Sequence, residues 1–234
     1  MKLDNKIRWI AVIGIAVLAQ SLPNSNAAPK PRHSIPISYD VVHAIPAGYG
    51  ADIVDIYANG VLIADNAVPG VIKTVTGQSG NVVVAVYANG VVPGPTTSPV
   101  LATEPVYLST NSKYSFVAHL NANEVAHLTA FRNMTTELGS KRSWLTVRNL
   151  SVAPDLNIRV NGARTFIPLP SGIERKKTFT VDTYTVTASY TELGAPVIGP
   201  TSVALKQGVN TILYIWGTKA KNNLAFLKEE IPAR

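Results

Sequence analysis

Hydrophobic and polar residues alternate in short runs along most of the chain, which is the period of a strand with one buried face. The runs are rich in Val, Ile, Thr and Tyr, and Gly, Pro and Asn separate them. No stretch of about a dozen residues keeps the period of an amphipathic helix. The pattern predicts an all-β protein of the sandwich type. The clearest strands are expected at residues 53–58, 81–88, 113–120, 144–149, 156–160, 183–190 and 211–216.

An internal repeat divides the chain into two similar halves. A longer similarity aligns residues 39–43 with 144–148, and then 53–60 with 156–162. The Asn-Gly pair near the end of each repeat marks a turn, because both residues tolerate a positive φ. We therefore expect two tandem immunoglobulin- or transthyretin-like β-sandwich domains. They are predicted at residues 39–138 and 139–234.

The first 27 residues have the pattern of a secretory signal peptide. Three basic residues precede an apolar run at 9–19, and small residues at positions 25 and 27 fit a cleavage site. The run is shorter than the roughly 20 residues that a membrane-spanning helix needs. We expect cleavage after Ala27 and then a Pro-rich, extended and unpaired leader at 28–38. The protein would be exported, to the periplasm, the cell surface or the extracellular space.

The composition limits the chemistry of the chain. It has 234 residues, 46% hydrophobic and 15% charged, and no Cys. The apolar fraction argues against wholesale disorder, and the lack of Cys excludes disulfides, thiolate metal sites and a cysteine nucleophile. No hydrolase, metalloprotease, phosphate-loop or dinucleotide signature is present. We therefore expect a protein without enzymatic activity, cofactor or metal, and keep a hydrolase with an unrecognised site as an alternative.

The stretch from Val42 to Gly60 resembles a family of secreted domains of unknown function. The family signature is His-Ala-x-Pro, then Val-Asp-Val-Tyr, then a polar residue and Gly. The second half keeps Ala-Pro-Asp at 153–155 and Asn-Gly at 161–162, but has Arg148-Asn149 in place of His-Ala and residues 158–160 in place of Val-Asp-Val. The resemblance implies exported tandem sandwiches on bacterial surfaces or outside cells, and no established chemistry. Its motif residues are read as structural: His43, Ala44, Pro46, Asp52, Asp55, Tyr57, Gly60, Pro154, Asp155 and Gly162.

Some of these side chains also admit a chemical interpretation. His43 and a neighbouring aspartate would make a general base or a ligand pair, and Asp52 with Asp55 would offer oxygen ligands to Ca²⁺. His119 and His127, with Glu124 as a third ligand, would suit a transition metal. Tryptophans 144 and 216 with the tyrosines would form a sugar-stacking face. In each case a role in packing or in the loops is the simpler interpretation.

The two halves carry opposite charges. Residues 35–138 hold three Lys or Arg and seven Asp or Glu, a net charge of −4, whereas residues 139–234 hold thirteen and six, a net charge of +7. The halves would therefore dock within one chain, pair head-to-tail between chains, or leave the basic half free to bind a polyanion. Arg175, Lys176 and Lys177 form the densest basic cluster, either a polyanion contact or a solvated loop between strands.

These observations predict an exported envelope or extracellular-matrix protein that acts in adhesion, scaffolding or head-to-tail assembly. The alternative is a monomeric module that binds a surface carbohydrate or another polyanion. No dedicated nucleic-acid fold is recognisable. The leader also has the composition to add as a strand to a neighbour's open sheet edge.

Overall fold

The computed structural model describes residues 36–191 and 194–233, and every regular element in these ranges is a strand. The predicted all-β fold is therefore confirmed, and several predicted runs coincide with strands to within a residue. The first half contains β1 (Pro36–Ala44), β2 (Val54–Ala58), β3 (Val61–Ala67), β4 (Ile72–Gln78), β5 (Gly80–Val82), β6 (Val84–Ala88), β7 (Leu101–Ala102), β8 (Val106–Leu108), β9 (Lys113–Leu120) and β10 (Ala126–Asn133). The second half contains β11 (Arg142–Asn149), β12 (Leu156–Val160), β13 (Ala163–Leu169), β14 (Glu174–Thr180), β15 (Thr183–Ser189), β16 (Ile198–Ala204), β17 (Val209–Trp216) and β18 (Ala225–Pro232).

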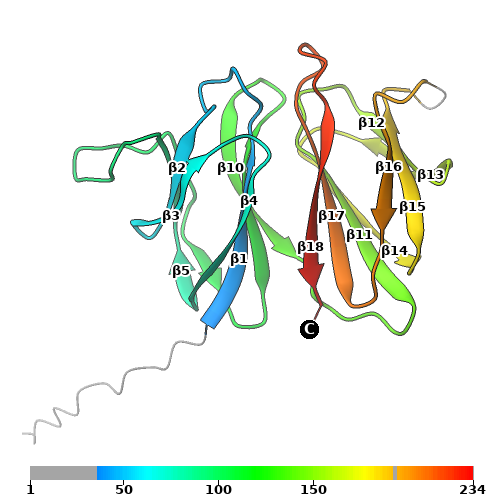
Figure 1. The fold of residues 1–234 in the computed structure, drawn as a ribbon, viewed down its shortest axis with the longest axis horizontal. Coiled ribbons are helices and arrows are strands. Elements are labelled where there is room, and N and C mark those ends of the chain that lie inside the picture. The colour runs from blue at the N-terminus through cyan, green and yellow to red at the C-terminus, as the bar shows by residue number, and fades with distance from the viewer. Residues whose placement is uncertain (1–35, 192–193, 234) are drawn as a thin grey trace, which may run out of the picture. The chain divides into compact units, whose positions relative to one another are not determined.

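Each half forms a sandwich of two four-stranded sheets (Figure 1). In the first sandwich, inner sheet 1 has the order β10-β9-β1-β4 and outer sheet 1 has the order β3-β2-β6-β7. In the second, inner sheet 2 has the order β14-β11-β17-β18 and outer sheet 2 the order β13-β12-β15-β16. One apolar core lies between the sheets of each pair, around Phe116 in the first sandwich and around Leu145 in the second.

The four-stranded sheets of the two sandwiches have the same strand order, and the first half adds a two-stranded sheet, β5-β8. β1 pairs in parallel with β9 and antiparallel with β4, and β11 pairs in parallel with β17 and antiparallel with β14. The hairpins β2–β3 and β12–β13 both turn at an Asn-Gly pair. Asn59 and Asn161 each have a φ of 48°, and the glycines that follow have φ of 79° and 75°. These left-handed angles are those of the tight hairpin turn that the sequence predicts.

A third apolar cluster joins the inner sheets of the two sandwiches. It includes Val42 and Val117 from the first sandwich, and Ile212, Tyr214 and Ile231 from the second. We call this contact the junction. Because the inner strands are covered on both faces, they read as nearly continuous apolar runs, whereas a strand with one face in water alternates. β1, β9 and β17 are buried along almost their whole length for this reason.

Three expectations concern the ends and the division of the chain. The predicted signal peptide, at 1–27, and residues 28–35 of the predicted leader lie outside the described residues. β1 begins at Pro36, which is paired with Gln78, so the last three residues of the predicted unpaired leader belong to a sheet. Residues Ser34–Arg234 form one compact unit, and the division into domains at 138/139 stays a prediction. No helix that could cross a membrane occurs in the part of the chain that the structure describes.

Candidate functional site

His43, the first residue of the family motif, ends β1 and holds the loop that follows. Its side chain is buried. Nε2 donates to the carbonyl oxygen of Ala51 over 2.7 Å, so Nδ1 is the acceptor that faces the N–H of Ile45 at 3.4 Å. Burial lowers the pKa of His43, against the smaller raising effects of the Ala51 bond and the Asp52 charge. The geometry thus favours the neutral ring, and both ring nitrogens serve the loop.

The two aspartates of the motif also bond to the backbone. Oδ1 of Asp52 accepts the N–H of Gly48 over 2.5 Å. Asp55 is buried, and its two oxygens accept the N–H groups of Asn66 and Gly90 over 2.9 and 2.8 Å. Asp55 therefore ties two loops to β2, which is a structural role for a buried carboxylate.

The remaining motif residues of the first sandwich contribute packing and turn geometry. Ala44 is fully buried in the junction cluster, and Pro46 is buried in the loop after β1. Tyr57 packs edge-to-face on Tyr87 with 5.3 Å between the ring centroids. Gly60 supplies the left-handed turn residue between β2 and β3.

In the second sandwich Asn149, and not Arg148, occupies the place of His43. The backbone N–H and carbonyl of His43 bond to the loop before β4, and those of Asn149 bond to the loop before β14. Oδ1 of Asn149 accepts the N–H two residues ahead over 3.2 Å, as Nδ1 of His43 does. The predicted alignment of His43 with Arg148 is therefore wrong by one residue. Because successive strand residues face opposite sides, this shift moves Arg148 from the core face to the junction face.

The other motif residues of the second copy lie on loops. Asp155 and Pro154 are exposed in the loop between β11 and β12, and Gly162 is in the turn between β12 and β13. The registers of β2 and β12 place Asn157 at the position of Asp55. Nδ2 of Asn157 donates to the carbonyl oxygen of Tyr190 over 3.4 Å, so an amide replaces the carboxylate at this position.

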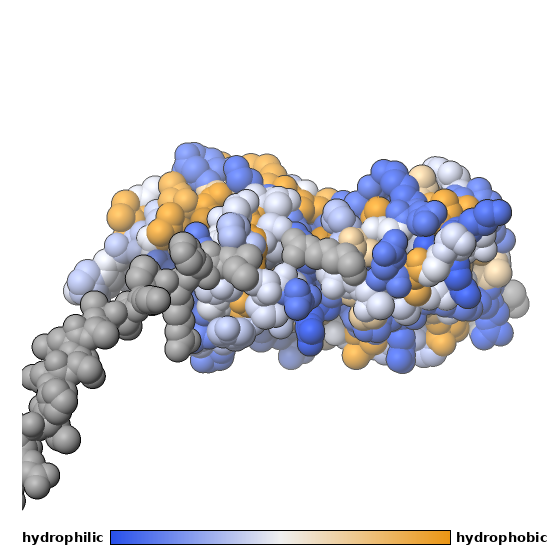
Figure 2. Space-filling view, turned by 90° about the horizontal axis from the view of Figure 1, so that it is seen from below, coloured by the Kyte–Doolittle hydropathy of each residue, from blue (hydrophilic) through white to orange (hydrophobic). Residues whose placement is uncertain are grey.

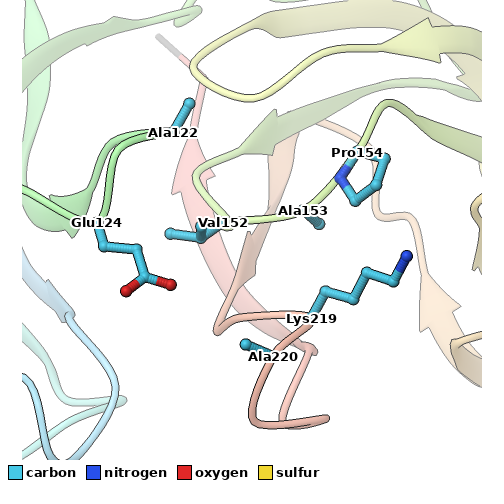
Figure 3. A pocket seen from close by; sticks show the side chains of 7 residues that line it. All are labelled: Ala122, Glu124, Val152, Ala153, Pro154, Lys219 and Ala220. Atoms are coloured by element: carbon cyan, nitrogen blue, oxygen red, sulfur yellow. The ribbon is translucent and has the colours of Figure 1, made fainter.

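Loops from both sandwiches meet at the end of the junction where β1, β9, β11 and β17 finish. Nζ of Lys221 donates to the carbonyl oxygens of Ala47 and Gly48 over 3.1 and 3.2 Å, and lies 4.0 Å from the ring centroid of Tyr49. An open cleft of about 440 Å³ lies at this end (Figure 3). Its floor is mostly small and apolar, and Glu124 and Lys219 lie at opposite sides of it (Figure 3).

The structure brings His119 and His127 together, as the sequence predicts, but places no third ligand beside them among the described residues. The rings of His119 and His127 stack with 6.3 Å between centroids. His119 bonds through Nδ1 to the carbonyl of Leu120 and through Nε2 to the hydroxyl of Thr129, both over 2.9 Å. Within residues 36–191 and 194–233, no three His, Asp or Glu side chains are grouped closely enough to hold a metal ion.

The aromatic side chains are divided between cores, junction and hairpins. Trp216 packs against the junction cluster, and Nε1 of Trp144 donates to the carbonyl oxygen of Thr136 over 3.3 Å. Tyr39 and Tyr214 are buried. Trp216 is therefore held by the junction, and Trp144 by the linker between β10 and β11, residues 134–141. Both contacts favour the packing interpretation over a sugar-stacking face.

A closed ring of hydrogen bonds between side chains crosses the junction. Arg148 donates from Nη2 to Oδ1 of Asn133 over 2.7 Å, and Nδ2 of Asn133 donates to Oγ of Ser115 over 2.8 Å. Ser115 donates to the carboxylate of Glu229 over 3.0 Å. On the other side, Nη1 of Arg148 donates to the hydroxyl of Tyr214 over 2.9 Å, and this hydroxyl donates to Glu229. Two members come from the first sandwich and three from the second.

Charged groups around the ring complete the junction. Nε of Arg148 pairs with Glu174 over 2.7 Å, and the guanidinium lies 4.4 Å from the ring centroid of Phe131. Asp40 is buried on β1 and accepts the hydroxyl of Thr74 over 2.5 Å. Arg148 is 1% exposed and Glu229 is 5% exposed, so the ring is shielded from solvent.

Sequence reasoning missed this ring. Its members lie far apart in the sequence, and the one motif at Asn133, the glycosylation acceptor pattern of residues 133–135, does not point to this role. A signal was nevertheless present, because Arg148 and Tyr214 interrupt apolar strands. A buried polar side chain in such a strand requires a partner.

The basic cluster at 175–177 lies within β14 and not in a loop. β14 is an edge strand of inner sheet 2, paired with β11 alone. Strand alternation places Arg175 and Lys177 on one face and Lys176 on the other, where its Nζ is 3.9 Å from Glu174. All three side chains are exposed. Three consecutive cations therefore follow an open sheet edge.

Comparison with known proteins places the chain in a family without assigning an activity. The family described as "Domain of unknown function (DUF4397)" matches residues 39–159. No curated protein matches the chain. Among the solved structures that match is one titled "The Bacillus anthracis TIE protein", at 9% identity and a TM-score of 0.22, covering 78% of this chain and 33% of that one. This chain thus spans about a third of that protein, and a likeness at this TM-score does not bear on function.

Proposed function

We propose that this chain, which belongs to the DUF4397 family of domains of unknown function, is an exported, non-enzymatic protein of the bacterial envelope or extracellular matrix. Its role in this proposal is adhesion and scaffolding through head-to-tail assembly. The acidic first sandwich of one copy contacts the basic second sandwich of the next. A heterologous contact of this kind leads to open chains of subunits unless the arrangement closes.

The observation that carries this proposal is the location of the opposite charges. The junction consists of a mainly apolar cluster and a few polar and charged groups that bond to one another. The contact between the sandwiches therefore does not neutralise the opposite charges on their surfaces. The first sandwich exposes five acidic and two basic side chains, and the second exposes ten basic and two acidic ones among the described residues. On the face in Figure 2, hydrophilic residues are spread along the surface and not gathered in one part of it.

Charge-guided association follows from this distribution by simple electrostatics. Exposed charges of opposite sign attract over about a Debye length, roughly 10 Å at 0.1 M salt, and salt weakens the attraction. The five exposed acids of the first sandwich are Asp52, Asp65, Glu104, Glu124 and Glu137. The densest exposed bases are those of β14, which also has an open backbone edge.

Charge reversal on β14 tests the assembly. The double variant Arg175→Glu/Lys177→Glu should reduce the sedimentation coefficient of the chain from residue 28 at low salt, because it removes attractive charges and adds repulsive ones. The matched control is Lys73→Glu, since Lys73 has the same register on β4 that Arg175 has on β14. The control should not reduce association. Equal sedimentation of all three proteins would contradict the proposal.

The row of cations on β14 also favours a second candidate function, the binding of a surface polyanion by a monomer. Nη2 of Arg142 donates to the hydroxyl of Thr178 over 2.9 Å and adds a fourth cation beside this strand. Retention on a heparin column, with elution at lower salt for Arg175→Glu than for Lys73→Glu, would support it. Equal elution of the two variants would argue against a specific role for β14.

A further inference from the structure

The junction buries charged side chains of both signs. Arg148 and Lys113 are its buried cations, and Lys113 donates from Nζ to the hydroxyl of Ser38. Asp40 and Glu229 are its buried carboxyl groups, and Glu174, which is 25% exposed, pairs with Arg148. A buried carboxylate that is bonded to neutral groups is costly, and uptake of a proton removes its charge.

Protonation of Glu229 would break no direct ion pair, whereas protonation of Glu174 would. Glu174 already has a charged partner at 2.7 Å, whereas the direct partners of Glu229 are two hydroxyl groups, from Ser115 and Tyr214. Each hydroxyl has lone pairs as well as a proton, so each can accept from a neutral carboxyl group. The ring therefore has a set of hydrogen bonds for either protonation state of Glu229.

Every strand packed against Glu229 contributes a polar or charged group on the junction face. Some of these groups favour the charged carboxylate and others disfavour it. They are Tyr214 on β17, Ser115, Lys113 and His119 on β9, Asp40 on β1, Asn133 and His127 on β10, Arg148 on β11, Glu174 on β14 and Thr74 on β4.

We propose that the junction is a proton-controlled contact, in which a proton on Glu229 strengthens the attachment of the two sandwiches and its loss weakens it. The proposal does not depend on the adhesive or scaffolding role. It concerns the stability of the contact itself and would hold for a monomer.

The electrostatics give the direction of the effect. Burial raises the pKa of Glu229 to about 7, helped by the charge of Asp40 and opposed by the bonds from Tyr214 and Ser115 and by the charge of Arg148. A carboxyl group whose pKa is raised on folding stabilises the folded state while it is protonated. This contribution is complete below the ordinary Glu value and is lost as the pH rises through about 7.

Glu229→Gln imitates the neutral carboxyl group and is the central variant. In urea unfolding it should differ from the wild type far less near pH 5 than at pH 8, where it should be the more stable protein. The unfolding equilibrium constants of the two proteins should then differ by on the order of a hundredfold, the ratio expected for a shift of this size. The matched control is Glu230→Gln, the next residue on β18, whose carboxylate is paired with Lys206 and Lys228. Glu230→Gln should leave the difference in the free energy of unfolding between pH 5 and pH 8 as it is in the wild type.

A second variant guards against loss of folding in the first. Asp40→Asn removes the charge that raises the pKa of Glu229, so the pH at which stability falls should move down.

In the chain from residue 28 the tryptophans are Trp144 and Trp216, both on inner sheet 2, and Trp216 packs in the junction. Their fluorescence should therefore show the weakened contact as it occurs. A Glu229→Gln protein that is less stable than the wild type by the same amount at every pH would overturn the proposal. So would an Asp40→Asn protein whose stability falls at the same pH as that of the wild type.

Discussion

Nη2 of Arg148 donates to Oδ1 of Asn133 over 2.7 Å, and this bond joins the last strand of the first sandwich to the first strand of the second. The two strands follow each other in the sequence, but the bond is not a local one, because Arg148 lies at the far end of β11 from the linker. Arg148 also bonds to Glu174 and Tyr214. One side chain thus connects three strands of its own sheet with the facing sheet.

Replacing Arg148 should therefore be among the most damaging changes in the chain. Arg148→Met would leave the buried Asn133 and the partly exposed Glu174 without the guanidinium, and breaking a buried pair in this way costs up to about 3–5 kcal/mol. The free energy of unfolding from urea titration measures the loss. Arg142→Met, on the same strand but exposed, should cost less than about 1 kcal/mol. Similar losses in the two variants would contradict the assigned role of the junction.

The loop after β1 should depend on His43 through its hydrogen bonds and not through any chemistry. His43→Ala removes the bonds to Ala51 and Ile45 and should cost about 1–3 kcal/mol. His43→Asn should cost less, because Asn149 fills the equivalent position in the second sandwich. Thermal unfolding of the two variants provides the comparison. An asparagine variant as unstable as the alanine variant would argue against the equivalence of the two positions.

Calcium should leave the stability unchanged. The carboxylate oxygens of Asp52 and Asp55 bond to backbone N–H groups, and Asp55 is buried. Binding to the folded state alone would raise the melting temperature once the free calcium concentration exceeds the dissociation constant. We therefore expect the same melting temperature with a chelator and with millimolar calcium. A clear rise with calcium would revive the idea of a cation site at these aspartates.

Buried histidines should give the protein an acid-sensitive stability of opposite sign to that of Glu229. Burial lowers the pKa of His43 and of His119, so the unfolded chain binds protons at a higher pH than the folded chain. Their contribution is present above the ordinary His value, about 6.5, and is lost as the pH falls below it. His119→Gln should reduce the loss of stability between pH 6.5 and pH 5. An undiminished loss in this variant would show that His119 does not contribute.

Much of the fold could be predicted because most strands keep their pattern locally. The strands at 113–120 and 156–160 are flanked by turn residues, and the structure gives both the predicted bounds. β14 was harder to recognise, since three consecutive charges do not alternate with apolar residues. The alignment of the second repeat on the first, β11 on β1, was wrong by one residue because both faces of these strands are buried. Alternation then no longer distinguishes one register from its neighbour.

The candidate site was less predictable than the fold. The motif residues His43 and Asp55 could be named from the sequence, but their partners come from the loops that the fold brings beside them. Ser115 and Glu229 are separated by 114 residues, and no local pattern relates them. Contacts between facing sheets depend on the packing of whole sandwiches, which a single sequence does not specify.

Light scattering of the chain from residue 28, measured across protein and salt concentration, tests the proposed function most directly. The account predicts that the mean molar mass rises with protein concentration at low salt and returns to that of one chain as salt screens the opposite surface charges. A molar mass of one chain under every condition would contradict head-to-tail assembly.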